Sequence, residues 1–500
     1  MALDLGPLVT HPPLLLAASV LLSPLIHLRA CLRSRRTSHI PGIRYGALPL
    51  LGPWIGAYHF LRDPEAVLRE GHAQHPTGCF KVATLTDEII IASGQEKFLE
   101  YIAAPDSVLN GIDAINSAIQ FEWTMGAGVY HRPYHIALVR GKLTQGVGKF
   151  LPDMQVEVDR LLREKIGEPE GWEEVDVHGV MINMIATTVN MALGGTRLAH
   201  DQAYLKEAIQ YTFDMMSSAE LVHSLPAWAK ELAMPFTPVY RNKKRCEKMV
   251  GEYIEERLKA TENGEVATED MLQWLIDAAP AEERTMVQLN ERLLSFQVAA
   301  IHTTTVTLTT AIYILCALPE VYLEPLRAEI RQNCPDGRFT KEALDRLTKV
   351  DSFLRECGRT GPIGTVASGR YAKADFHFRD GTLIPQGCMV FGNTPVLHRI
   401  LSKEEARFDG FRSSRLAEGG EGKKQPQLVS TGGDNVNFGH WRHACPGRFF
   451  AAAEVKLILA KLILRYDMEL IPGTKSMRMY IGTTKIPETK LKIRMRAATS

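Results

Sequence analysis

The sequence predicts a mainly α-helical protein with a small β region, and the helical part rests on composition and periodicity. The chain has 500 residues, of which 45% are hydrophobic, enough to bury an extensive core. Apolar residues recur at helical spacing over most of residues 133–361. Turn residues interrupt this pattern near 167–172, 262–266 and 278–281. We therefore expect several long helices in the middle of the chain.

The β region is predicted from short runs rich in β-branched residues. Residues 81–83 and 89–91 are two such runs, and a turn at 86–87 separates them, which indicates a β-pair. Further strands are expected around 382–391 and near the C-terminus. The strands should therefore come from both ends of the chain.

The N-terminus has the features of a membrane anchor. Residues 8–28 are mostly apolar and about 20 residues long, which suits a bilayer core of ~30 Å. By the positive-inside rule, the cations that follow keep the rest of the chain cytoplasmic: Arg29, Arg33, Arg35 and Arg36. A cleaved signal peptide is the alternative, but cleavable signals carry their positive charge before the apolar stretch. We expect an uncleaved, single-pass anchor at 1–36 in the endoplasmic-reticulum membrane, then a Pro/Gly hinge at 37–56.

Charge and cysteine pattern exclude two further classes of protein. The formal net charge is +1, so no nucleic-acid partner is expected. Eight cysteines are scattered without a pairing pattern and indicate reduced thiols in a cytosol-facing chain: Cys31, Cys79, Cys246, Cys316, Cys334, Cys357, Cys388 and Cys445. A disulfide framework is therefore not expected.

Cys445 differs from the other cysteines in its surroundings. It lies between a segment with turn residues and cations and a predicted helix at 448–464. A cysteine binds metal as the thiolate, and the free amides and dipole of a helix N-terminus favour such an anion. Gly447 has no Cβ and would let the backbone approach the sulfur closely. Taken alone, Cys445 could be a buried small hydrophobic residue, but its neighbours disfavour that interpretation.

A long apolar pattern at 287–318 contains a second group of candidates. Ala299 and Ala300 are small and would leave room beside a helix. His302 titrates near neutrality, and the hydroxyl of Thr303 can bond within the helix or hold water.

These segments resemble the cytochrome P-450 superfamily. The run 438–447 is similar to the family's haem loop, Phe-x-x-Gly-x-basic-x-Cys-x-Gly, although Trp441 stands at the usual glycine. Residues 299–305 resemble the family's distal helix motif, with His302 in place of the acid. The resemblance implies the cytochrome P-450 fold, with the catalytic domain at 57–500.

A charge triad is the third point of resemblance. Glu356 and Arg359 form the family's Glu-x-x-Arg, which places both charges on one helical face. Arg412 stands in the downstream segment that usually reads Phe-x-Pro-x-Arg, with Gly410 for the proline. The resemblance implies that the triad locks the structure under the haem.

The resemblance also implies a cofactor and the residues of this chain that bind it. It implies haem b, with Cys445 as the axial thiolate ligand of the iron. The other cofactor-binding residues would be Phe438, Gly447, His443, Arg370 and Arg140. Ile136 replaces the tryptophan that usually precedes Arg140. Each arginine could instead be an ordinary surface charge, which is the commoner case.

On the other face of the haem, the resemblance implies that Thr303 delivers protons during O2 activation. His302, together with water, would take part in this proton delivery. Alternatively, it is an ordinary helix histidine whose hydrogen bonds are satisfied within the protein. Substrate contacts would come from stretches that are apolar and poor in charge, although core packing is the commoner role for any single one of them. These are 115–123, 213–216, Ala299 and Thr303, 363–366 and 481–483.

The activity implied is that of a monooxygenase that inserts one oxygen atom of O2 into a lipophilic substrate. The sequence contains no flavin-binding domain, so electrons are expected from NADPH through a separate cytochrome P-450 reductase. Arg448, Lys456 and Lys461 are candidate cations for docking the reductase; alternatively, they belong to a solvated face of the helix.

The 299–304 variant resembles fungal secondary-metabolism members that act on terpenoid and indole-diterpene scaffolds. An isomerase or dehydratase without O2 activation is the alternative, and a non-enzymatic haem protein is a third, disfavoured by Thr303 and the apolar distal segments.

Overall fold

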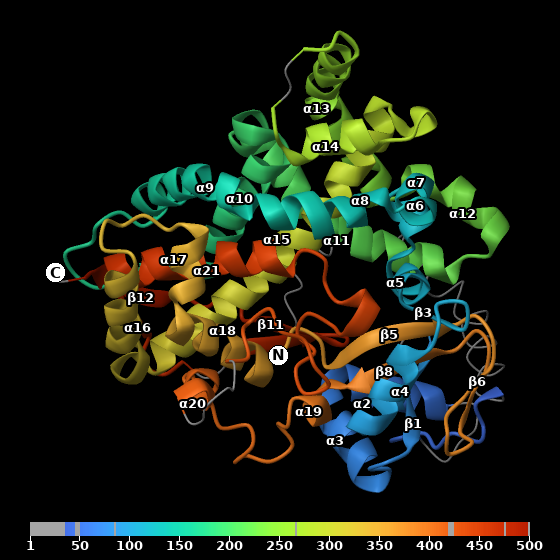
Figure 1. Cartoon of the computed structure of the whole chain (residues 1–500). Helices are drawn as coiled ribbons and strands as arrows, with labels where there is room; N and C mark the ends of the chain where they lie inside the picture. Colours follow the sequence, from blue (N-terminus) through green and yellow to red (C-terminus); the bar gives the residue numbers. More distant parts are fainter. Residues whose placement is uncertain are drawn as a thin grey trace.

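The computed structural model describes residues 36–45, 51–84, 87–265, 268–418, 425–474 and 477–498. It is mainly helical with a small β region, as the sequence predicts (Figure 1). The predicted anchor lies outside the described residues except for Arg36 and stays a prediction. The predicted hinge is described in part, and helix α2 (Gly52–Arg62) begins within it.

A five-stranded sheet in the order β1-β2-β8-β5-β3 forms most of the β region. Figure 1 shows it at the lower right, beside α2, α3 and α4. Its strands are β1 (Cys79–Ala83), β2 (Glu88–Ala92), β3 (Leu109–Asn110), β5 (Val366–Ala372) and β8 (Met389–Asn393). The predicted pair is confirmed: β1 and β2 are antiparallel, with Phe80 opposite Ile91. β2 then pairs in parallel with β8, so strands from both ends of the chain meet here.

Three smaller sheets complete the β structure of the described residues. One has the order β4-β12-β9, and the others are the pairs β10–β11 and β6–β7. The bounds are β4 (Glu173–Val175), β6 (Phe376–His377), β7 (Leu383–Ile384), β9 (Tyr466–Leu470), β10 (Arg478–Ile481), β11 (Thr484–Pro487) and β12 (Ile493–Ala497). The strands predicted around 382–391 and near the C-terminus are therefore confirmed.

Helices form the rest of the fold, and the predicted interruptions fall between them. The first helices after α2 are α3 (Pro64–Gln74), α4 (Gln95–Ala103), α5 (Gly111–Ile119), α6 (Phe121–Thr124), α7 (Ala127–His131) and α8 (Tyr134–Leu138), the last followed by a π-helical turn (Val139–Leu143). The long helices are α9 (Thr144–Lys165), α10 (Val177–Ala199), α11 (Gln202–Ser224), α13 (Pro238–Glu262), α15 (Met286–Ala317), α16 (Pro319–Asn333), α18 (Thr348–Thr360) and α21 (Arg448–Arg465). The short ones are α12 (Ala227–Ala233), α14 (Met271–Ala278), α17 (Lys341–Arg346), α19 (Thr394–Leu397) and α20 (Arg412–Glu418).

Helix α15 is the central helix of the molecule. It begins after Thr285, whose side chain accepts a hydrogen bond from the backbone N–H of Gln288. Most of its side chains are buried, because α10, α11 and α13 pack around it. A helix that is apolar on nearly all sides suits such a position. The apolar pattern at 287–318 therefore predicted this helix correctly.

Two described helices, α10 and α15, are long and apolar enough to cross a membrane. However, 72% and 67% of their apolar windows are buried inside the protein. We therefore interpret both as core helices.

Candidate functional site

The loop that carries Cys445 is fixed by its own backbone. The N–H of Cys445 donates a hydrogen bond to the carbonyl of Phe438 at 2.7 Å. Gly439 turns the chain with φ +66°, and a Cβ there would lie 3.3 Å from the carbonyl oxygen of His443. Gly447 is the N-cap of α21, so Cys445 lies just before the N-terminus of that helix.

The sulfur of Cys445 is in a mixed electrostatic environment. Burial raises the pKa of the thiol, while the backbone N–H groups of Gly447 and Arg448 and the Arg448 charge lower it. Arg448 also donates from Nη1 to the carbonyl of Cys445 at 2.8 Å. An iron ion would add a larger positive charge and remove the proton outright. The amides at the start of α21 and the Arg448 charge would help to stabilise the sulfur as a thiolate, and metal binding by Cys445 stays a prediction.

One face of α15 is open although the helix is otherwise in the core. Ala299 and Thr303, one turn apart, are exposed, whereas Ile301, Thr304 and Thr305 are buried. The hydroxyl of Thr303 donates to the carbonyl of Ala299 at 2.7 Å. Its lone pairs can therefore accept a hydrogen bond from a molecule on the open face.

His302 makes its contacts elsewhere. Its Nε2 lies 2.9 Å from the carbonyl of Ile209 on α11, and its ring meets Phe213 edge-on with centroids 4.9 Å apart. Burial lowers the pKa of His302, which favours the neutral ring. These contacts fit the alternative in which His302 is a satisfied helix histidine, and its part in proton delivery stays a prediction.

Arg370 and His443 share one small region beside α5. A Cβ added at Gly111 would lie 3.0 Å from the His443 ring and 3.2 Å from Nη1 of Arg370. His443 is held by Asp106, with Nε2 and Oδ1 2.8 Å apart. Arg370 is 2% exposed and donates only from Nη1, to the carbonyls of Ser368 and Gly369.

The guanidinium of Arg370 is left with unsatisfied donors. Its Nε and Nη2 are buried and have no hydrogen-bond partner. Such groups are rare, since a buried unpaired donor is costly. A carboxylate placed beside Arg370 and His443 would satisfy both side chains. The residues present therefore fit a haem, whose propionates are two such carboxylates.

Arg140 lies apart from that pair. It is exposed, on the π-helical turn after α8, and its Nη2 donates to the carbonyl of Arg442 at 2.8 Å. This bond joins α8 to the Cys445 loop. A contact of Arg140 with the cofactor stays a prediction.

The structure brings the three members of the predicted charge triad together. Arg359 donates to both carboxylate oxygens of Glu356, at 2.8 and 2.6 Å, and the Nε of Arg412 lies 3.4 Å from Glu356 Oε2. The Glu356 side chain is 3% exposed, against 45% for that of Arg412. Arg359 also donates to the backbone carbonyls of the segment that precedes α20: His398, Arg399, Glu405 and Arg407. The triad therefore ties α18 to that segment.

His398 has a structural role that sequence analysis missed. It is 1% exposed, and its Nε2 accepts from the N–H of Val436 at 3.0 Å while Nδ1 lies 3.2 Å from the Arg359 carbonyl. Burial lowers its pKa to about 4, so the ring is neutral at pH 7. His398 thereby connects α18 to the segment that leads to Cys445. No local sequence signal could have found it, since its partners are distant in the chain.

Two of the candidate docking cations are buried and cannot contact a partner protein. Lys456 and Lys461 are each 6% exposed and form ion pairs with Asp351 and Asp159. The expectation was wrong because α21 is packed on all sides rather than on one face. Arg448 lies with its guanidinium over the ring of Phe449.

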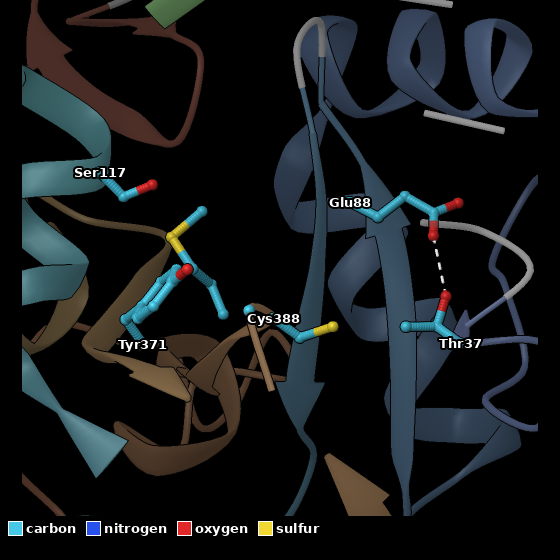
Figure 2. Close-up of a pocket in the computed structure, with 7 residues that line it drawn as sticks. Thr37, Glu88, Ser117, Tyr371 and Cys388 are labelled. Carbon is cyan, nitrogen blue, oxygen red and sulfur yellow. Dashed lines mark hydrogen bonds between the residues drawn. The ribbon is translucent and has the colours of Figure 1, made fainter. Parts of the chain in front are cut away.

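The predicted substrate segments are only partly open. Phe213 and Met216 are 44% and 53% exposed, while Met215 is buried. A small pocket lies elsewhere, between β1–β2, β8 and α5, with an empty volume of about 310 Å³ (Figure 2). Its lining is Thr37, Glu88, Ser117, Tyr371, Gly387, Cys388 and Met389. Ser117 belongs to the predicted substrate segment 115–123, whereas none of the other lining residues is a predicted site residue.

Comparisons with known proteins agree with this geometry. The model of the cytochrome P450 family matches residues 131–495. Cytochrome P450 monooxygenase 103 of Postia placenta is 30% identical over 97% of this chain and 98% of its own length. Ent-kaurene oxidase of Gibberella intermedia is 26% identical over 93% of this chain and 89% of its own. The solved structure of retinoic acid-bound cyanobacterial CYP120A1 superposes with a TM-score of 0.68 at 20% identity, covering 92% of this chain and 99% of that one.

The structural likeness confirms the cytochrome P450 fold. The family match brings with it a haem iron held by a cysteine thiolate and electrons supplied by a reductase. This chain therefore belongs to the cytochrome P450 family and is a cytochrome P450 monooxygenase.

Proposed function

We propose that this chain is a membrane-anchored monooxygenase of fungal secondary metabolism that oxidises a lipophilic, terpenoid-derived substrate. The observation that carries the site assignment is Arg370, a buried cation with two unsatisfied donors beside His443. It supports a haem held at its propionates by these two residues, with Cys445 as the ligand of the iron. Bound haem would supply the activation of O2 and the oxidation of a C–H bond.

The chain's own residues prepare this chemistry in three ways. The Phe438 carbonyl and the amides at the start of α21 hold the Cys445 sulfur in place as an electron-rich ligand. Thr303 Oγ1 is bonded to the Ala299 carbonyl and can hold water on the open face of α15. We assign to that hydroxyl the delivery of protons. The Glu356–Arg359–Arg412 triad keeps α18 and the segment before α20 together beneath the site.

The lipophilic substrate class is supported by the open face of α15 and by the relatives. Small Ala299 lies on that face, and apolar Phe213 and Met216 are exposed on neighbouring α11. The terpenoid part of the proposal is supported by the similarity to Ent-kaurene oxidase over 93% of this chain.

Membrane association is supported by large exposed apolar side chains on α12 and on α2, of which α2 follows the predicted anchor in the sequence. Trp228, Leu232 and Phe236 are 75%, 67% and 81% exposed on α12 and the turn after it. Helix α2, which follows the predicted anchor, exposes Tyr58 at 58% and Leu61 at 45%. Large exposed apolar side chains of this kind are typical of membrane and protein interaction sites. We propose an endoplasmic-reticulum location with the catalytic domain in the cytosol.

The first test is the carbon-monoxide difference spectrum of microsomes that contain the reduced protein. We expect a strongly red-shifted Soret band, and its loss in Cys445→Ser with the protein still folded. A thiolate spectrum that survives Cys445→Ser would show that the ligand assignment is wrong. Product formation should then require NADPH, reductase and O2.

An isomerase or dehydratase reaction is the second candidate. His302 is the only ionisable residue in the 299–305 motif, and its ring is hydrogen-bonded to the Ile209 carbonyl on α11. If His302 is held there and does not deliver protons, the motif has no ionisable group for O2 activation. Turnover of an oxygenated substrate without NADPH or O2 would support it.

A further inference from the structure

The open face of α15 carries a second hydroxyl, one helical turn beyond Thr303. Thr307 is partly exposed there, and its Oγ1 donates a hydrogen bond to the Thr303 carbonyl at 2.9 Å. Thr303 makes the same kind of bond to the Ala299 carbonyl at 2.7 Å. Residues four positions apart lie on one face of a helix, so the two hydroxyls share the open face. A molecule that lies along this face therefore meets two polar groups in succession.

Thr307 lies on the part of α15 that approaches two predicted substrate segments. Thr310, three residues further along the helix, has its Cγ2 only 3.2 Å from the place of a Cβ added at Gly361. Gly361 ends α18 and comes directly before the predicted substrate stretch 363–366. Strand β11, which follows the predicted stretch 481–483, also packs against α15. The open face thus leads from Thr303, past Thr307, toward these two segments.

The hydroxyl of Thr307 presents only acceptor lone pairs to the open face, because its proton is used inside the helix. Among the described residues, no donor reaches those lone pairs. Thr305 makes the same bond, to the Ile301 carbonyl at 2.7 Å, but it is 0% exposed. Water can therefore hydrate Thr307 but not Thr305. A hydrocarbon that covers Thr307 would displace this water without replacing its hydrogen bond, whereas a hydroxyl group would replace it.

We propose that Thr307 is a specificity-determining residue that accepts a hydrogen bond from a hydroxyl of the substrate. The substrates are then lipophilic alcohols rather than hydrocarbons. This inference rests on the proposed function and narrows its substrate class. The neighbouring partly open positions Ala299, Ala300 and Val306 are apolar, so a polar group at Thr307 fixes the orientation of an otherwise lipophilic molecule. A reaction that introduces a hydroxyl, such as an earlier hydroxylation or hydration, must supply such a substrate.

The test measures how strongly the haem-loaded protein prefers an alcohol to the matching hydrocarbon. The probes are androstane and a set of androstanols that each carry one hydroxyl at a different ring position. Equilibrium dialysis gives the dissociation constants without relying on the haem spectrum. We expect the wild type to bind at least one androstanol about fivefold to tenfold more tightly than androstane, the effect of one hydrogen bond.

Substitutions at Thr307 should remove and restore this preference. Thr307→Val keeps the branched shape but has no acceptor, so the preference should fall below about twofold. Thr307→Ser keeps the hydroxyl and should retain most of the preference. Thr305→Val is the matched control, because it removes an identically bonded hydroxyl from the buried side of the same helix. It should leave the preference unchanged, and all three variants should keep the carbon-monoxide spectrum of the wild type.

Three results would overturn the assignment of Thr307. The first is a wild type that binds androstane as tightly as every androstanol. The second is a preference that survives in Thr307→Val, and the third is an equal loss of preference in Thr305→Val, which would indicate a general effect on α15. The proposed function has a separate criterion. If the reduced wild type lacks the thiolate spectrum with carbon monoxide, that function fails, whatever preference the dialysis shows.

Discussion

Replacing Glu356 by glutamine should be among the most destabilising single changes in this chain. The side chain keeps its shape, but Arg359 loses the charge on the carboxylate that it holds at 2.6 and 2.8 Å. Both side chains are largely buried, at 3% and 14% exposure. Breaking such a buried pair typically costs about 3–5 kcal/mol. Arg359 keeps its carbonyl acceptors, so we expect the lower end, about 3 kcal/mol.

Arg412→Gln provides the matched control for this prediction. Its Nε is 3.4 Å from the same carboxylate, but its side chain is 45% exposed, so the loss should stay below about 1 kcal/mol. Urea-induced unfolding of the haem-loaded protein, followed by tryptophan fluorescence, gives both values from the shift in midpoint. Equal losses in the two variants would refute the reasoning, because burial would then not decide the strength of these ion pairs.

Three further predictions concern buried or partly open polar groups. Arg370→Leu should accelerate the transfer of haem to apomyoglobin about tenfold or more, because a propionate would lose a charge-assisted partner worth about 1.5–3 kcal/mol; an unchanged rate would show that Arg370 does not bind the cofactor. Thr303→Ala should release more hydrogen peroxide per NADPH consumed, and unchanged coupling would remove Thr303 from proton delivery. Burial raises the pKa of Glu454 from 4.5 to about 8, and Thr188 is its hydrogen-bond donor. The folded state therefore holds this proton more tightly than the unfolded state, so the free energy of unfolding should fall as pH rises from 4.5 to about 8. Glu454→Gln should flatten that part of the profile, measured by urea unfolding at several pH values, and an identical profile would contradict the prediction.

Much of the fold was predictable because its signals are local. The apolar pattern at 287–318 predicted α15, and the runs at 81–83 and 89–91 predicted the β1–β2 pair. Periodicity reports which faces of a segment avoid water, and this suffices for elements in the core. The Cys445 loop could be recognised for the same reason, since its essential residues lie within ten positions of one another.

Periodicity failed where charged groups are buried by distant partners. Lys456 and Lys461 read as a solvated face of α21, yet both are paired with carboxylates more than 100 residues away. The sequence also could not reveal that His302 bonds to α11 or that His398 joins α18 to the Cys445 segment. Each of these side chains is polar, and its burial depends on whether another chain segment offers a partner.

The sequence by itself determined the family, the main elements and the residue at the centre of the chemistry, Cys445. Tertiary structure alone decided which polar groups are satisfied and which are not. Arg370 illustrates this, since nothing in its neighbours along the chain indicates that two of its donors are buried without a partner. The reason is that local patterns fix what a segment prefers to bury, whereas hydrogen bonds and ion pairs between distant segments exist only once the chain has folded.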